Sequence, residues 1–208
     1  GTIGELGCVS FHDTKNVSCG EGGSIFVNNP SLRLPAEIIR EKGTDRAAYF
    51  RGEVDKYGWK GLGSSYLLSD ILAAKLLAQL EELEYITTKR KEIWQRYYDG
   101  LLSLEKQGKC KLPYIPEFSD HNGHIFYLVC HDEKERDELI YYLKRNGIHS
   151  TFHYLSLHRS EFFKYKYKGC DLPNSVRFTK CLIRLPIYPD LNLNDQKNII
   201  QKTLSFYY

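Results

Sequence analysis

The stretch that decides the fold lies near the start of the chain: Ser10-Phe11-His12-Asp13-Thr14-Lys15-Asn16, followed by Gly20-Glu21-Gly22-Gly23. Short apolar segments rich in strand-forming residues flank it, at residues 7–11 and 24–27. The glycines between them allow backbone angles that other residues avoid. The sequence therefore predicts two strands joined by a glycine-rich connection, with Lys15 just beyond the first strand.

Lys15 is the first candidate for chemistry. An amine that loses solvent beside a buried strand is the nucleophile that forms a Schiff base with an aldehyde. His12 is near enough in sequence to line the same pocket. By spacing alone, a solvated surface lysine is the more common arrangement, so both interpretations stay open at this point.

The rest of the first half is expected to be mainly helical. We predict a short helix over 35–42 with Gly43 at its end, and an irregular aromatic loop over 44–65. A long helix follows, capped by Ser69 or Asp70 and running to about Leu104, with one bend or break. We place a domain boundary inside it, giving domains 1–90 and 91–208.

The second half is predicted to be an α+β domain with a small antiparallel sheet. Asp132 and Glu135 form a capping pair, and Asn194 caps the last helix. The expected strands span 124–130, 148–154 and 182–185, and the expected helices span 133–146, 173–181 and 194–207.

Composition excludes several classes of protein. With 42% hydrophobic and 26% charged residues the chain is expected to fold, and a net charge of +3 does not indicate a nucleic-acid partner. No apolar run is long enough for a membrane span, and no signal peptide is recognised. Six cysteines without a C-x-x-C pair indicate free thiols and a cytoplasmic location. No metal site is predicted.

The order of these motifs resembles the DegT/DnrJ/StrS family of sugar-nucleotide aminotransferases. Within it, the run Phe11-His12-Asp13-Thr14-Lys15-Asn16 and the segment Asp55-Lys56-Tyr57-x-Trp59 are most similar to the transaminases that form dTDP-4-amino-4,6-dideoxygalactose. The other motifs that carry the resemblance are Gly63-Ser64-Ser65-Tyr66-Leu67-Leu68-Ser69-Asp70, Gly147-Ile148, His153-Tyr154, Leu157-His158 and Leu185-Pro186-Ile187-Tyr188-Pro189.

The resemblance implies an α/β to α+β chain of the pyridoxal 5'-phosphate (PLP) transferase type, fold type I (aspartate aminotransferase), comprising the end of the large domain and the small domain. It implies that Lys15 is catalytic and holds PLP. Ser10 would bind the cofactor phosphate, and Asn16 would support the lysine loop. Ser65, where many relatives have asparagine, would meet the phosphate of the neighbouring subunit's cofactor.

Substrate contacts are expected from His12 and, in the small domain, from His153, Tyr154 and His158, although structural roles for His153 and His158 are equally open. The expected substrates are a dTDP-linked 4-keto-6-deoxy sugar and an amino acid donor, with glutamate preferred, and the expected assembly is a homodimer. A family dehydratase is disfavoured, because those relatives have histidine in place of Lys15.

The family's remaining PLP contacts precede the lysine, whereas only fourteen residues precede Lys15 here, and the chain contains no methionine. We therefore expect a C-terminal portion that is inactive in isolation. The alternative is a folded interaction module without catalysis.

Overall fold

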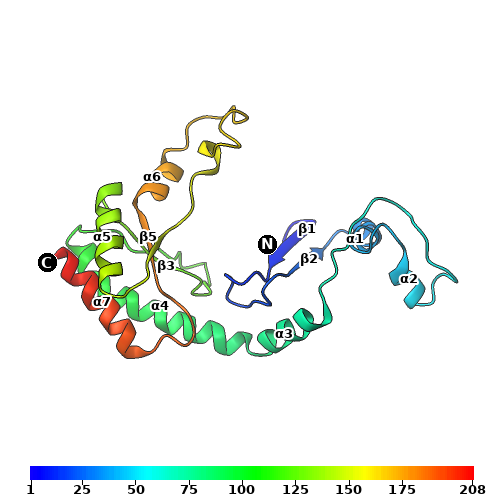
Figure 1. Cartoon of the computed structure of the whole chain (residues 1–208), viewed down its shortest axis with the longest axis horizontal. Coiled ribbons are helices and arrows are strands. Elements are labelled where there is room, and N and C mark those ends of the chain that lie inside the picture. The colour runs from blue at the N-terminus through cyan, green and yellow to red at the C-terminus, as the bar shows by residue number, and fades with distance from the viewer. The chain divides into compact units, whose positions relative to one another are not determined.

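The computed structural model describes all residues, 1–208, and consists of two compact units, Gly1–Glu84 and Tyr85–Tyr208 (Figure 1). Unit 1 opens with an antiparallel hairpin. Its strands are β1 (Leu6–Ser10) and β2 (Gly23–Val27), with Cys8 opposite Ile25. These strands lie within a residue of the predicted ones, so the hairpin prediction is confirmed.

Three helices complete unit 1: α1 (Arg33–Arg40), which follows the short turn η1 (Pro30–Leu32), then α2 (Arg46–Phe50) and α3 (Asp70–Glu81). The prediction that residues 44–65 are wholly irregular was wrong at α2. The backbone N–H of Gly58 donates to Asp45 Oδ1 at 2.7 Å, and Lys60 Nζ lies 3.3 Å from Asp45 Oδ2. The loop thus folds back onto the start of α2, a long-range contact that no local sequence pattern reports.

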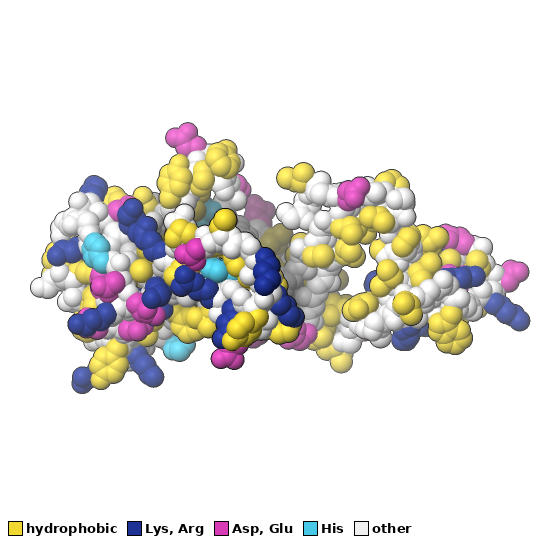
Figure 2. Space-filling model, turned by 90° about the horizontal axis from the view of Figure 1, so that it is seen from above, with side chains coloured by type: hydrophobic (Ala, Val, Ile, Leu, Met, Phe, Trp, Pro, Cys, Tyr) yellow, Lys and Arg dark blue, Asp and Glu magenta, His cyan; other side chains and the backbone are white.

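Unit 1 has very little core. Its buried apolar side chains are Val17, Cys19 and Ala48, and α3 buries none of its residues. Apolar side chains instead lie at the surface, as Figure 2 shows for unit 1 at the right of that view. They include Trp59, which is 84% exposed, and Leu62, which is 95% exposed.

The long predicted helix is two helices, since α3 ends and α4 (Leu83–Lys106) begins on either side of Glu82. The single break that we predicted is therefore confirmed. Ser69 caps α3, because its side chain accepts a hydrogen bond from the Leu72 N–H at 3.4 Å.

Helix α4 supplies one wall of the unit 2 core. Its buried residues recur every three or four positions, which places them on one face of the helix. This face packs with the sheet and with the other helices of the unit. The members of the face are Ile93, Trp94, Tyr97, Leu101 and Leu104.

The sheet of unit 2 has three strands in the order β3 (Phe126–Val129), β5 (Leu182–Leu185) and β4 (Thr151–Phe152), and both pairings are antiparallel. The helices of this unit, besides α4, are α5 (Glu133–Arg145), α6 (Pro173–Cys181) and α7 (Leu193–Tyr207), with the turn η2 (Leu157–Arg159) before α6. Helices α5 and α7 are in contact (Figure 1). The predicted antiparallel sheet is confirmed.

Two details of unit 2 differ from the prediction. Strand β4 covers two of the seven predicted residues, because Tyr154 has a φ of 38°, outside the strand range, and ends the extended run. The cap of α7 is Asn192, not Asn194. Asn192 Oδ1 accepts from the Asp195 N–H at 2.9 Å, and Asn192 Nδ2 donates to Asp195 Oδ2 at 2.6 Å, a reciprocal pair that selects the earlier asparagine. The Asp132–Glu135 cap of α5 forms as predicted.

None of the helices combines the length and the apolar character that crossing a membrane requires.

Candidate active site

The loop that carries Lys15, residues 11–22, is closed by its own backbone. We call it the Lys15 loop. Phe11 N–H donates to Gly22 O and Asp13 N–H donates to Gly20 O, each at 2.8 Å, and Lys15 N–H donates to His12 O at 2.9 Å. These bonds join residues of the loop itself and fix the path of the chain on both sides of the lysine.

A buried thiol lies under this loop. Cys19 is 1% exposed, and its Sγ lies 3.7 Å from Phe11 O and 3.4 Å from Glu21 O. A Cβ on Gly22 would lie 2.4 Å from this sulfur, so only glycine fits there. The glycine-rich sequence thus lets the two sides of the loop close around Cys19.

His12 is engaged with its own loop. Its Nδ1 accepts from the Thr14 N–H at 3.2 Å and lies 3.0 Å from Thr14 Oγ1, while its Nε2 lies 3.5 Å from Glu21 Oε1. These contacts tie both ring nitrogens to residues of the loop. The predicted substrate contact of His12 stays a prediction.

Lys15 itself is exposed in this chain. The desolvation that we expect for Lys15 in the complete protein stays a prediction. Ser10 is also exposed, and its Oγ accepts from the His12 N–H at 3.3 Å. Asn16 is half-buried beside the lysine. The structure thus gathers Ser10, Lys15 and Asn16 on one ordered hairpin.

This donor set fits PLP. A primary amine on an ordered turn can bond covalently to an aldehyde, and a hydroxyl five residues earlier at the end of β1 can donate to a phosphate.

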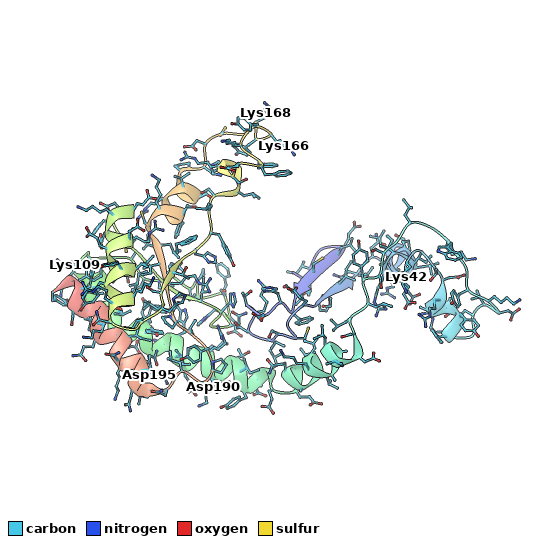
Figure 3. All side chains as sticks on the ribbon, viewed as in Figure 1. Lys42, Lys109, Lys166, Lys168, Asp190 and Asp195 are labelled. Atoms are coloured by element: carbon cyan, nitrogen blue, oxygen red, sulfur yellow. The ribbon has the colours of Figure 1, made fainter.

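Ser65 lies on a different segment of unit 1, where it bridges to Glu41 just after α1. Lys42, labelled in Figure 3, has a φ of 64°, and its N–H donates to Ser64 O at 3.0 Å. The two backbones cross at Gly43 and Gly63: a Cβ on Gly63 would lie 2.2 Å from Gly43 N. Glycine is therefore required for the loop that carries Ser65 to pack here.

In unit 2, His153 and Tyr154 form a small aromatic pair, with ring centroids 4.4 Å apart. Arg184 Nη1 donates to His153 Nδ1 at 3.3 Å. Burial, together with the nearby Arg184 charge, lowers the pKa of His153. The ring is thus neutral at neutral pH, and its Nε2–H is left to donate to a ligand.

His158 sits differently from His153. It is buried, its ring packs against Tyr167 with centroids 5.3 Å apart, and its Nε2 lies 3.8 Å from Asp171 Oδ1. The sequence left open whether His158 has a structural role or contacts the substrate. These contacts favour the structural role, and a substrate contact from His158 stays a prediction.

Sequence reasoning missed two residues that hold the predicted ones in place, Glu21 and Arg184. Arg184 interrupts the apolar run Leu182-Ile183-Arg184-Leu185 and pairs in register with Thr151, two residues before His153. A charge within an otherwise buried strand was the signal that could have identified it.

Comparison with known proteins settles the family. The model of the DegT/DnrJ/EryC1/StrS aminotransferase family matches residues 1–204. The chain belongs to this family. The motifs around Lys15, Ser65 and His153 are therefore parts of one family pattern that runs along the whole chain.

Several solved structures share the fold. The aminotransferase TlmJ from Streptoalloteichus hindustanus matches with a TM-score of 0.86 at 23% identity, over 100% of this chain and 53% of its own. A family aminotransferase from Brucella abortus matches with a TM-score of 0.82 at 28% identity, over 98% of this chain and 51% of its own. NtdA from Bacillus subtilis, solved with bound cofactor PMP, matches with a TM-score of 0.81 at 22% identity, over 97% of this chain and 46% of its own.

The predicted fold class, the fold type I of PLP-dependent transferases, is confirmed by these matches. The chain spans about half the length of these solved relatives.

Proposed function

We propose that the complete protein is a PLP-dependent aminotransferase that transfers an amino group from an amino acid, with glutamate as the preferred donor, to a dTDP-linked 4-keto-6-deoxy sugar. The observation that carries the proposal is the Lys15 loop, which presents an amine on a rigid turn within a chain that matches an aminotransferase family from residue 1 to residue 204. The PMP-bound relative supports the choice of cofactor.

Each residue of unit 1 has a proposed task. PLP supplies an electron sink when bound. Lys15 would hold the cofactor through Nζ and would move a proton at the donor carbon. Ser10 would donate its hydroxyl to the phosphate, and Asn16 would keep the lysine turn in place. Ser65 donates to the phosphate at the partner subunit's site, as the two-subunit sites expected of the family require.

In unit 2, we assign His153 and Tyr154 to the sugar nucleotide. The neutral imidazole of His153, held by Arg184, donates from Nε2, and Tyr154 presents an exposed ring and hydroxyl beside it. Replacing His153 with alanine is expected to raise the KM for the sugar nucleotide more than the KM for the amino donor.

The exposed apolar surface of unit 1 supports a homodimer. Unit 1 buries three apolar side chains, and α3 buries none of its residues. The apolar surface that remains is larger than a free monomer normally exposes to solvent. The same surface also favours the alternative function, a non-catalytic interaction module. Light scattering on the complete protein tests the assembly, and transaminase activity separates the two functions.

The central experiment replaces Lys15 in a protein completed to the family's length. We expect Lys15→Arg to remove the visible imine absorbance and to reduce transamination by roughly 10²–10⁴-fold. Lys75→Ala, at an exposed lysine of α3, is the matched control and should change neither. Amino transfer that survives undiminished in the Lys15 variant refutes the proposal.

We also propose that the 208 residues alone lack this activity, because Lys15 and Ser10 are exposed to solvent. Mixing the isolated chain with PLP should give no stable imine band. A strong band that depends on Lys15 would show that the chain is sufficient for binding.

A further inference from the structure

Three cysteines of unit 2 lie in a row across its sheet and the segment that bridges to β3. Val129 pairs with Leu182 in the β3–β5 register, which places Cys130 opposite Cys181, and the Cys130 N–H donates to Cys181 O at 2.9 Å. On the other side of β3, Lys111 bridges antiparallel to Val129, which places Cys110 opposite Cys130. All three side chains are buried, and no two of them form a disulfide.

The hydrogen bonds identify the type of each pairing. Lys111 and Val129 exchange both backbone bonds, at 3.0 and 2.9 Å, so they are a hydrogen-bonded pair. The bridge is isolated, and Cys110 and Cys130 are the residues next to it on the two segments. Facing residues in antiparallel segments have Cα atoms about 4.5–5.5 Å apart, and a disulfide needs Cα atoms about 4.4–6.8 Å apart, so the two cysteines are placed where a disulfide can form.

The same two thiols border one small pocket of about 290 Å³. His131 and Arg177 also line it. The pocket lies beside the turn after α4, where Lys109 is labelled in Figure 3. Both cysteines therefore line the same pocket, and we expect a reagent to reach them through it.

We propose that Cys110 and Cys130 are a redox modification site: they form a reversible intramolecular disulfide when the chain meets a disulfide oxidant such as oxidised glutathione. Cys110, at 4% exposure against 1% for Cys130, reacts first. Its thiolate attacks one sulfur of the oxidant and releases one glutathione thiolate, and the Cys130 thiolate then attacks Cys110 Sγ and releases the second. Both cysteines lose a proton, and the two electrons pass to the oxidant.

The bond fastens the turn after α4 to β3. The chain between the two cysteines contains His121, which packs on Trp94 with ring centroids 4.6 Å apart, and Gly123, whose carbonyl accepts from Arg90 Nε at 3.2 Å. Oxidation therefore closes a covalent loop around a segment that already packs on α4. The expected effect is a stiffer unit 2 that unfolds at higher denaturant concentration.

Burial raises the pKa of Cys110 and of Cys130 to about 12 each. The groups that face the two sulfurs besides each other are Glu105, Glu135, Arg136, Cys181 and the Tyr207 hydroxyl, which lies 3.7 Å from Cys130 Sγ. Thiolates are rare here near neutral pH, so oxidation is slow and accelerates with rising pH.

The test uses the full 208-residue chain with Cys8→Ser and Cys170→Ser, because these two exposed thiols would otherwise capture the oxidant. After treatment with oxidised glutathione at mildly alkaline pH, remaining thiols are blocked and the chain is cut with trypsin without reduction. Cleavage after Lys109, Lys111 and Lys134 should yield the dipeptide Cys110-Lys111 joined to the peptide 112–134. Dithiothreitol should separate them and reverse the shift in denaturant midpoint.

The matched control is Cys181→Ser, which keeps the proposed pair and should still give the linked peptide, whereas Cys110→Ala should not. A link between Cys130 and Cys181 overturns the proposal. So does recovery of both Cys110 and Cys130 as blocked thiols under conditions that fully oxidise Cys170 in a parallel sample of the unsubstituted chain. The peptide map of the chain that keeps the three buried cysteines of unit 2 decides this even if a core variant fails to fold.

Discussion

Tyr97 offers the sharpest test of how unit 2 is held together. Its side chain is fully buried, its ring stacks on Phe126 with centroids 5.1 Å apart, and its hydroxyl donates to Pro186 O at 2.8 Å. This single bond ties α4 to the motif Leu185-Pro186-Ile187-Tyr188-Pro189 that leads from β5 toward α7. Replacing Tyr97 with phenylalanine removes the hydroxyl and keeps the ring.

The expected loss of stability depends on the Pro186 carbonyl, which loses its hydrogen-bond donor. A neutral hydrogen bond contributes about 0.5–1.5 kcal/mol net, and an acceptor left without a donor in a buried place costs about 1–3 kcal/mol. Pro186 is half-buried and keeps some access to water. We therefore expect Tyr97→Phe to lower the free energy of unfolding by about 1–2 kcal/mol.

Urea unfolding followed by circular dichroism measures the effect. Phe126→Ala removes the ring that stacks on Tyr97, and we expect it to lower the free energy of unfolding by about 3–5 kcal/mol, the largest effect in this series. Tyr98→Phe is the matched control, because the Tyr98 ring is half-buried against Trp94, and it should stay within about 0.5 kcal/mol. If Tyr97→Phe is as neutral as this control, the bond to Pro186 does not hold the segment and the reasoning fails.

Two further predictions concern stability at other places. Because burial raises the pKa of Cys110 and of Cys130 from 9.0 to about 12 in the folded chain, the stability that the two protonated thiols contribute is complete below about pH 9 and is lost as the pH rises from there toward 12. Urea midpoints from about pH 8 to about pH 10 should fall less steeply in a variant with Cys110→Ser and Cys130→Ser than in the unsubstituted chain, and equal slopes would contradict this. Gly63→Ala should cost about 1–3 kcal/mol in unit 1, because its Cβ meets the backbone of Gly43 and Ile39. Gly61→Ala is the control, because a Cβ on Gly61 would contact no other atom. Hydrogen exchange at the Lys42 amide, which donates to Ser64 O, measures the loss of stability. Equal exchange rates in the two variants would contradict the prediction.

The sequence predicted the elements that local signals control. The hairpin around Lys15, the Ser69 and Asp132 caps and the helix Pro173–Cys181 were all visible, because each depends on glycine, capping or periodicity within a few residues.

The sequence failed where distant partners decide the structure. Helix α2 depends on Asp45 meeting Gly58, thirteen residues away, and the length of β4 depends on how far it pairs with β5. The choice of Asn192 over Asn194 depended on a local partner that we did not weigh, Asp195. For the candidate site, the motif identified Lys15 and His153. The hydrogen bond from the Lys15 N–H to His12 O and the bond from Arg184 to His153 could be identified only in the structure.

The closure of the hairpin by its own bonds also affects the order in which the protein folds. The backbone bonds that close the turn around Lys15 join residues between 6 and 27, so the entropy lost in forming them is small compared with that of a distant pairing. Contacts of this kind form in about 1–10 μs, far faster than a ribosome adds a residue. The reactive turn can thus take its shape while the sequence that follows it is still being made.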